Sequence, residues 1–386
     1  AEETQEEIKQ KTEDLESAIK AEKLGYHFPV ITGNDIKKVW NLRKAGLGVL
    51  SNMPGDAKPV RVIEDTAVNP EVLPQYIDEF NALLRKHNLS CVYYAHIGTG
   101  ELHLRPVLNL RDPKDVMLFH TIALETAKLV KKYKGSLSGE HGDGRLRGEF
   151  IPLMIGEKNY TLLTKIKHTW DPFGVFNKGK ITDTPPMNTM LRFEPGAQVR
   201  EIDTYYDFTH DHGMLRAVEK CNGSGDCRKP HLASGGMCPS YQASLDEKNS
   251  TRARANILRE YLTNSPKANP FNHRDIYKAL DLCLGCKLCK SECPSSVDMA
   301  KYKTEFLQHW YNTHPVRIRT RAIAYIDSIN RLALPFSGIY NLFAKSSFLS
   351  WPIKKIIGFA PQRSLPELHG KSLRRRARKN LPELNK

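Results

Sequence analysis

The cysteines of this sequence are spaced for iron rather than for disulfides. Seven of the eight lie between Cys221 and Cys293, in Cys-Pro and Cys-x2-Cys settings, which favours metal binding in a reducing compartment. One run reads Cys283-x2-Cys286-x2-Cys289-x3-Cys293-Pro. In two-cluster ferredoxins, three thiolates at this spacing hold one cluster, and the cysteine before proline binds the other. The run therefore predicts two iron–sulfur clusters and requires a second motif.

That second motif lies upstream, with Cys-Pro at its end. Pairing the two motifs across a pseudo-twofold axis assigns one 4Fe–4S cluster to four thiolates: Cys283, Cys286, Cys289 and Cys238. The second cluster takes Cys221, Cys227 and Cys293, and Ser224 stands where its fourth cysteine belongs. Serine ligates iron poorly, so this cluster is either 3Fe–4S with an open corner or 4Fe–4S with a non-cysteine ligand. A structural zinc site is the alternative, but the paired Cys-Pro motifs favour iron–sulfur.

A helix is predicted to begin at Ser250-Thr-Arg252-Ala-Arg254, close to these cysteines. The favoured interpretation is an ordinary N-cap. In the alternative, the two arginines face the clusters and adjust their potentials.

Histidines and carboxylates gather in two glycine-rich segments of the first half. In His96-Ile-Gly-Thr-Gly-Glu-Leu-His103, a glycine bend separates two histidines whose rings can converge on one ion across a hairpin. The later segment Ser-Gly-Glu140-His141-Gly places a carboxylate beside a third histidine. Two histidines, Glu140 and an open position form a divalent-metal site that can hold a substrate. His141 is then a candidate base; loop histidines with ordinary hydrogen bonds are the alternative.

The glycines of these segments, Gly142 among them, let the backbone approach a flat cofactor or adopt a positive φ. A phosphate-binding loop is the other interpretation, but the sequence contains neither a G-x-G-x-x-G after a strand nor a Walker A motif.

The composition is globular, 40% hydrophobic and 26% charged, with no apolar run long enough to span a bilayer. A net charge of +15 raises a nucleic-acid role, yet no groove-binding motif or aromatic platform accompanies it. The dense basic run is typical of a solvated tail and comprises Arg374, Arg375, Arg376, Arg378 and Lys379. We expect a cytoplasmic protein and leave open a peripheral contact with an anionic partner or the inner face of the membrane.

The chain starts at Ala1 with an acidic segment and has no signal-peptide pattern. We therefore expect a cut made within a longer polypeptide.

The elements that must position these groups alternate between helices and hairpin strands. Strands are predicted over 90–97 and 102–110, joined by the glycine bend, and a short strand over 26–32. A helix from 35 to about 44 is expected to stop at Gly46 and Gly48. The order fits α+β better than a doubly wound sheet. The predicted domains are 1–182, a linker at 183–200, a helical iron–sulfur domain at 201–310 and a helical, basic connector broken by prolines at 311–386.

Three motifs of the first half resemble the C-terminal domain of FAD-linked oxidases, a family that includes D-lactate dehydrogenases, the glycolate oxidase FAD subunit and D-2-hydroxyglutarate dehydrogenase. They are His96-x6-His103, Ser138-Gly-Glu-His-Gly and Asp171-Pro-x-Gly-x-Phe-Asn-x-Gly-Lys180. The segments Cys221-Asn-Gly-x-Gly-x-Cys-Arg, Met237-Cys-Pro-Ser-Tyr and Ser250-Thr-Arg-x-Arg-Ala-Asn resemble the fused form, in which the oxidase and a ferredoxin-like module share one chain. The resemblance covers about 30–310.

The resemblance implies an α+β, ferredoxin-like substrate domain packed over FAD. It implies that His96, His103 and Glu140 bind a divalent metal such as Zn or Mn, and that His141 is the general base. Asn177 and Lys180 match the segment near the flavin, and Arg43 matches a residue that binds the substrate carboxylate.

The sequence also departs from the family. The FAD-binding N-terminal domain and the cysteine-rich CCG-type segments are not in it. Arg105 stands where the hydroxyglutarate branch tends to carry Asn, which puts the substrate in doubt.

Two functions are therefore weighed. The first is an FAD-dependent oxidoreductase for a D-2-hydroxyacid such as D-lactate, glycolate or D-2-hydroxyglutarate. It would pass electrons through the clusters to a quinone, a cytochrome or a redox protein, and this fragment alone could be inactive. The alternative is a non-catalytic iron–sulfur subunit that docks a separate flavoprotein.

Overall fold

The computed structural model describes residues 4–233, 235–373, 375, 377 and 378. The chain divides into two compact units, one of residues 1–266 with 273–303 and one of residues 267–272 with 304–386. The first unit contains both the predicted metal site and all the cysteines. The predicted boundaries at 183–200 and at 310 stay predictions.

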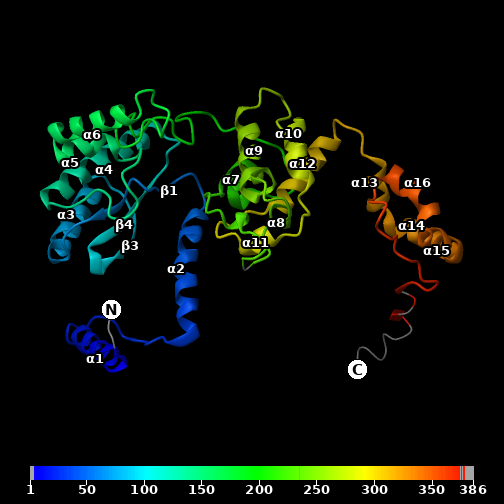
Figure 1. The fold of residues 1–386 in the computed structure, drawn as a ribbon, viewed down its shortest axis with the longest axis horizontal. Helices are drawn as coiled ribbons and strands as arrows, with labels where there is room; N and C mark the ends of the chain where they lie inside the picture. The colour runs from blue at the N-terminus through cyan, green and yellow to red at the C-terminus, as the bar shows by residue number, and fades with distance from the viewer. Residues whose placement is uncertain (1–3, 234, 374, 376, 379–386) are drawn as a thin grey trace. The chain divides into compact units, whose positions relative to one another are not determined.

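A small antiparallel sheet lies in the first half of unit 1 (Figure 1). In the described residues its strands are β1 (Lys58–Pro59), β2 (Ile63–Ala67), β3 (Cys91–His96) and β4 (Glu101–Leu108). β4 pairs with β3 along one edge and with β2 and β1 along the other. A single bridge from Ala67 to Ser136 lies beyond β2. The resulting order, bridge–β2–β4–β3, is that of a ferredoxin-like unit whose last strand is reduced to one bridge. The predicted α+β, ferredoxin-like class is confirmed.

Two amphipathic helices, α3 (Leu73–Lys86) and α4 (Pro113–Lys132), cover one face of this sheet. Tyr76 and Phe80 of α3 and Ile122 of α4 are fully buried in one cluster with Leu102 and Leu104 of β4. Each such side chain contributes about 1.5–3 kcal/mol through burial. Because side chains alternate along a strand, the polar residues between these leucines are turned to the opposite face of the sheet.

Further helices complete unit 1. Before the sheet come α1 (Gln5–Ala21) and α2 (Ile36–Ser51), and after it α5 (Ile151–Ile155) and α6 (Glu157–Trp170). The cysteine-rich part is helical with loops, as predicted: α7 (Met214–Glu219), α8 (Pro239–Ser244), α9 (Thr251–Asn264), α10 (Arg274–Asp281) and α11 (Leu288–Glu292). Its core is formed by buried side chains that include Val218, Leu258 and Ile276.

Two local predictions in unit 1 are wrong. Residues 26–32 form no strand in the described structure, because no neighbouring strand pairs with them. The helix predicted to stop at Gly46 and Gly48 instead continues as α2 to Ser51. A glycine costs a helix only about 1 kcal/mol, and Gly48 is buried against Pro294, where a Cβ atom would lie 2.3 Å from the proline.

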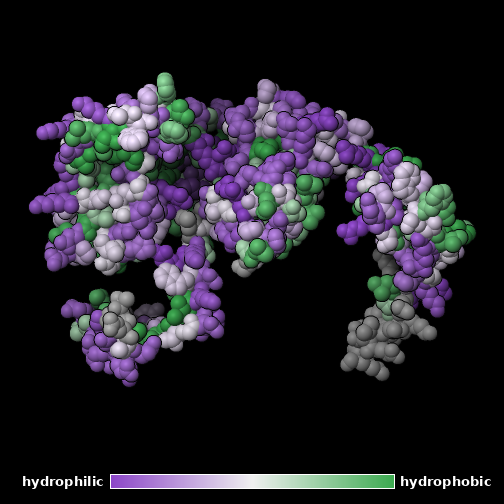
Figure 2. Space-filling model, viewed as in Figure 1, coloured by the Kyte–Doolittle hydropathy of each residue, from purple (hydrophilic) through white to green (hydrophobic). Residues whose placement is uncertain are grey.

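Unit 2 consists of short helices: α12 (Met299–Tyr311) leads into it, followed by α13 (Ile318–Ala324), α14 (Ile326–Ala333), α15 (Ser337–Lys345) and α16 (Ser347–Ile357). Pro352 was predicted to interrupt a helix, but it lies inside α16. There it costs the helix one backbone hydrogen bond. Figure 2 shows hydrophobic residues at the surface of these helices, and Leu332, Ile339 and Phe348 are among the exposed ones.

Of the predicted basic run, Arg375 and Arg378 are exposed, whereas Arg374, Arg376 and Lys379 lie outside the described residues. Across the described helices, none combines the length and the apolar character that a bilayer crossing requires.

Candidate functional site

The candidate metal site lies on the sheet face that α3 and α4 leave uncovered. Glu101 and His103 alternate along β4, and the paired strand β3 brings His96 opposite Glu101 and Tyr94 opposite His103. The two predicted histidines lie with ring centroids 5.2 Å apart. His103 is 3% exposed, whereas the side chain of His96 is 40% exposed. The site therefore has a buried floor and an open rim.

The loop after α4 brings the remaining predicted residues to the same place. Glu140 Oε1 lies 3.7 Å from His96 Nε2, 3.7 Å from His103 Nε2 and 3.4 Å from His141 Nε2. These spacings are too long for hydrogen bonds. They are close to the roughly 3.4 Å expected between ligand atoms that share one tetrahedral ion at about 2.1 Å. One carboxylate oxygen is thus central to all three imidazoles.

Asp65, which sequence analysis missed, holds this loop. Its φ of +83° falls at a β-bulge in β2 between Glu64 and Thr66, and bulges commonly redirect side chains beside functional sites. The buried Asp65 carboxylate accepts hydrogen bonds from the backbone N–H groups of Glu140 and His141, both at 3.0 Å, and from Ser138 Oγ. A carboxylate oxygen of Glu64 and one of Asp65 each lie within 4.8 Å of a ring nitrogen of His103.

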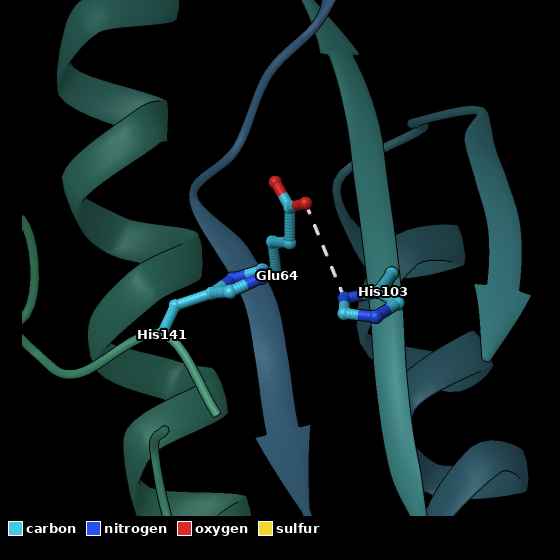
Figure 3. A group of neighbouring side chains, drawn as sticks. All are labelled: Glu64, His103 and His141. Carbon is cyan, nitrogen blue, oxygen red and sulfur yellow. Dashed lines mark ion pairs between the residues drawn. The ribbon is translucent and has the colours of Figure 1, made fainter. Parts of the chain in front are cut away.

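Glu64 belongs to the floor of the site (Figure 3). Its Oε1 lies 4.0 Å from His103 Nδ1, and the two side chains, from β2 and β4, point toward each other. Arg105, two residues beyond His103 on β4, forms a salt bridge with Glu64 and lies over the Tyr94 ring. The alternation Glu-Leu-His-Leu-Arg from Glu101 to Arg105 is the sequence signal that could have identified Glu101 and Arg105 as residues of this face.

Burial and neighbouring carboxylates shift the pKa values of the groups on the floor of the site. Burial, aided by the neighbouring Asp65 and Glu140 carboxylates, raises the pKa of Glu101 to about 7. Burial opposes ionisation of Asp65, but its hydrogen bonds outweigh that effect and lower its pKa to about 2. Burial lowers the pKa of His103, so its imidazole is neutral at pH 7, which is the form that binds metals.

Two buried atoms of the floor, Glu101 Oε1 and His103 Nδ1, have no hydrogen-bond partner among the described residues. Such groups are normally satisfied. Four overlapping sets of His and carboxylate atoms lie within 4.8 Å of one another, and one is His96, His103 and Glu140. The donor set therefore fits a divalent ion.

The other residues predicted for substrate and cofactor lie on α2 and on two loops. Arg43 of α2 approaches His96, with Nη2 3.5 Å from Nε2. Lys180 Nζ donates to Asn177 Oδ1 at 2.9 Å, and both side chains are exposed. The carbonyl of Gly142 accepts a hydrogen bond from Arg147 at 2.8 Å. The loop with Asn177 and Lys180 joins the glycine-rich loop through one backbone hydrogen bond, from Ile181 to Gly144.

The cysteines form two groups. Cys238, Cys283, Cys286 and Cys289 line one cavity together with Arg254. Arg254 is 1% exposed, and its guanidinium lies 3.6 Å from Cys238 Sγ while donating to Ala279 O and Ser240 Oγ. Ser250 caps the same helix by accepting from Ala253 N. The N-cap is present, and of the two arginines only Arg254 directs its side chain at a cysteine, because the Arg252 guanidinium pairs with Glu247.

The second group consists of Cys221, Cys227 and Cys293. Charge on Cys293 would raise the pKa of the Cys221 thiol, and charge on Cys238, Cys221 or Cys293 would raise that of the Cys227 thiol. The backbone N–H of Arg252 approaches Cys227 Sγ at 3.4 Å. Ser224 is exposed beside them, and its N–H donates to Asn222 Oδ1 at 3.0 Å.

Burial raises the pKa of the Cys221 and Cys227 thiols. Burial also raises the pKa of the Cys289 thiol, to about 11. Iron requires thiolates, so loading either group releases protons. Among the described residues, no cysteine belongs to a set of three ligand atoms within 4.8 Å of one another.

Comparisons with known proteins match both halves. Residues 1–181 match the family model for the C-terminal domain of FAD linked oxidases, and residues 220–298 match the 4Fe-4S dicluster domain. D-2-hydroxyglutarate dehydrogenases of Pantoea ananatis and Escherichia coli are each 31% identical over 377 residues, covering 86% of this chain and 36% of theirs. A glycolate oxidase subunit of Bacillus subtilis is 22% identical over 139 residues, covering 36% of this chain and 29% of its own.

The chain thus spans just over a third of the length of these dehydrogenases. The two matched ranges contain the candidate metal site and the two cysteine groups, respectively. Residues 1–181 are a C-terminal domain of the FAD-linked oxidase family, and residues 220–298 are a 4Fe–4S dicluster domain joined to it.

Proposed function

We propose that this chain is the substrate-binding and electron-transfer part of an FAD-dependent D-2-hydroxyacid dehydrogenase. The observation that carries the proposal is the convergence of His96, His103 and His141 on Glu140 in the same compact unit as two cysteine groups. The names of the relatives, D-2-hydroxyglutarate dehydrogenases among them, support a 2-hydroxyacid substrate.

His96, His103 and Glu140 would hold a divalent ion such as Zn or Mn. When bound, the ion supplies Lewis acidity to the substrate hydroxyl and carboxylate. Arg43, at the exposed rim beside His96, would contact the substrate carboxylate. The nearest atoms of the three proposed ligands support this assignment, since Glu140 Oε1 lies 3.7 Å from both His96 Nε2 and His103 Nε2.

His141 would take the hydroxyl proton. Its Nε2 faces Glu140, and its Nδ1 lies 3.7 Å from Asp65 Oδ1. A carboxylate behind one ring nitrogen orients the imidazole, so that the other nitrogen can accept a proton from the substrate. Removal of this proton makes the hydride on the substrate Cα easier to release.

FAD would meet this domain at the rim formed by Gly142, Asn177 and Lys180. Large apolar side chains beside that loop are exposed, Trp170 by 83% and Phe173 by 90%, which suits a surface covered by a flavin-binding domain. FAD supplies the hydride acceptor, and the clusters supply one-electron carriers.

Cys238, Cys283, Cys286 and Cys289 would hold a 4Fe–4S cluster. Cys221, Cys227 and Cys293 would hold the second, as 3Fe–4S or as 4Fe–4S with a non-cysteine ligand near Ser224. The terminal acceptor would be a quinone, a cytochrome or a redox protein.

A cytoplasmic location with peripheral contact to an acidic membrane face is part of the proposal. It rests on unit 2, where exposed Ile339 and Phe348 lie on α15 and α16, which also carry Lys345 and Lys355. Exposed apolar residues combined with basic ones are typical of helices at a membrane surface.

The test is anaerobic substrate reduction of the flavin-containing holoenzyme. D-2-hydroxyglutarate, D-lactate and glycolate are added separately, while flavin absorbance and cluster EPR are followed. We expect one of them to bleach the flavin and reduce the clusters. If dithionite reduces the clusters but no hydroxyacid does, the non-catalytic subunit that docks a separate flavoprotein is the correct function.

A further inference from the structure

Helix α2 connects the candidate metal site with the second cysteine group. At one point of the helix, Arg43 approaches His96. Five residues later, Gly48 packs against Pro294, the residue after Cys293. At a rise of about 1.5 Å per residue, these two contacts are separated by only about 7.5 Å of helix axis.

The contact at Pro294 is close. A Cβ atom on Gly48 would lie 2.3 Å from both Cβ and O of Pro294, far inside van der Waals contact. The Asn52 side-chain amide, just after α2, also donates to Pro294 O at 3.4 Å. Only a glycine allows the helix backbone to approach the Cys293-Pro294 segment in this way.

Two ion pairs also join the FAD-oxidase domain to the helix of the dicluster domain that precedes Cys221. Arg111, after β4, forms two hydrogen bonds of 2.7 Å with Glu219. Arg216 forms a bidentate pair with Asp56, at 2.6 and 2.7 Å. Both partners belong to α7, which ends two residues before Cys221.

The segment between the domains adds one more link on this side. Arg192 donates to the carbonyl of Cys221 at 3.1 Å. The second cysteine group is therefore bordered by the FAD-oxidase domain at Pro294, next to Cys293, and by the segment between the domains at Cys221.

The first cysteine group contacts its own domain instead. Asn249 O and Arg254 lie at Cys238, and Lys303 Nζ donates to the carbonyl of Cys283 at 2.6 Å. Cys286 is exposed, and the neighbouring Leu284 is 73% exposed. This group thus has an open side within unit 1.

We propose that the group Cys221, Cys227 and Cys293 is the entry point for electrons, and that the group Cys238, Cys283, Cys286 and Cys289 is the exit. This order rests on the proposed function. Oxidation of the hydroxyacid to the oxoacid releases a hydride to FAD and a proton to His141, which is two electrons and two protons in total. The electrons leave the reduced flavin one at a time, pass the entry and exit clusters, and reach a quinone or a one-electron redox protein.

The first experiment tests the geometry without flavin or substrate. The chain is reconstituted with iron and sulfide, and its dithionite-reduced EPR spectrum is compared for Gly48→Ala and Gly46→Ala. These substitutions are matched, because both glycines lie in α2 and a Cβ at Gly46 meets nothing within 4 Å. Cys227→Ser and Cys286→Ser assign the two signals.

We expect Gly48→Ala to change the line shape or midpoint of the signal that Cys227→Ser alters, and Gly46→Ala to change neither signal. The proposal is overturned if Gly48→Ala affects the signal that Cys286→Ser alters, or affects none.

The second experiment measures the order in the flavin-containing holoenzyme by freeze-quench EPR after substrate addition. In Cys286→Ser, substrate should still reduce the entry cluster at the wild-type rate. In Cys227→Ser, the exit cluster should no longer be reduced by substrate within one turnover, although dithionite reduces it. The reverse pattern overturns the order.

If no hydroxyacid bleaches the flavin of the wild type, the proposed function fails. The Gly48 comparison still decides which cluster borders the oxidase domain.

Discussion

The buried carboxylate of Asp65 accepts a hydrogen bond from the backbone N–H of His141, with 3.0 Å between Oδ2 and N. Asp65 lies on a strand bulge and His141 in the loop after α4, 76 residues later. A residue that ligates nothing in our assignment thus fixes both the candidate base and, through a second N–H, the ligand Glu140.

Replacing Asp65 with asparagine should therefore lower metal affinity by about 10–100-fold, as for other outer-shell partners of metal ligands. The measurement is a competitive metal titration of the chain, with the exposed Asp78→Asn as control. Unchanged affinity in Asp65→Asn would show that the loop holds its shape without this carboxylate.

The same residue predicts acid sensitivity. Hydrogen bonds depress the folded pKa of Asp65 to about 2, below its ordinary value of 3.8. The stabilisation is therefore fully present above about pH 4 and is lost as pH falls toward 2. Denaturant unfolding of the metal-free chain should show a wild-type advantage over Asp65→Asn at neutral pH that shrinks in acid.

His141→Gln should slow substrate-driven flavin reduction by about 10²–10⁴-fold, because the proton acceptor is lost while the ligand set remains. Stopped-flow absorbance of the holoenzyme gives the rate, and metal analysis verifies that the ion is retained. His168→Gln, an exposed histidine paired with Asp183, is the control and should reduce at the normal rate. A fast His141→Gln would refute its role as base.

Ser224→Cys should complete the second ligand set. If that corner is open in the wild type, the iron content rises from about seven to about eight per chain and the oxidised 3Fe–4S signal disappears. If a non-cysteine ligand already fills it, iron stays near eight and only the reduced signal changes. Iron, acid-labile sulfide and EPR are measured together, with the exposed Ser90→Cys as control. A spectrum identical to wild type would mean that Ser224 is not at the corner.

Arg254→Lys should lower the reduction potential of the cluster that Cys286→Ser alters. The buried guanidinium is directed at Cys238 Sγ, and loss of hydrogen bonding to sulfur disfavours the reduced cluster. Arg252→Lys is the matched control, because Arg252 approaches Cys227 with its backbone N–H and directs its side chain to Glu247. EPR-monitored redox titration decides; equal potentials for Arg254→Lys and wild type would exclude this tuning.

Asp56→Asn should weaken the attachment of the two domains by about 1–3 kcal/mol at neutral pH, the range for hydrogen bonds to charged groups. The hydrogen bond from Arg216, together with the charges of Arg216, Arg111 and Lys58, outweighs burial and lowers the pKa of Asp56. Its contribution is present above the ordinary value of 3.8 and is lost as pH falls through the depressed folded pKa.

Denaturant unfolding at several pH values measures this effect. Asp275→Asn, at an exposed pair with Lys278, is the control. An Asp56→Asn deficit that persists unchanged at low pH would contradict the assignment to an ionised carboxylate.

The sequence by itself determined the chemistry that depends on local spacing. The Cys-x2-Cys-x2-Cys run and the two Cys-Pro motifs indicated two clusters, because ligands a few residues apart wrap one cluster through local backbone geometry. The His96 and His103 pair followed similarly from a hairpin, where a short bend fixes which side chains face each other. The alternation of polar and apolar residues around His103 was enough to predict the strand.

Only the tertiary structure decided the relationships between distant segments. The bulge that brings Glu64 and Asp65 to one face of β2 breaks the two-residue period on which strand predictions depend. α2 continues beyond Gly48, and Pro294, 246 residues later in the sequence, packs where a side chain at position 48 would lie. A prediction that ends a helix at glycine cannot account for this distant contact. Which cysteine group borders the oxidase domain depends on such packing, since ligand spacing is satisfied equally by either orientation of the dicluster domain.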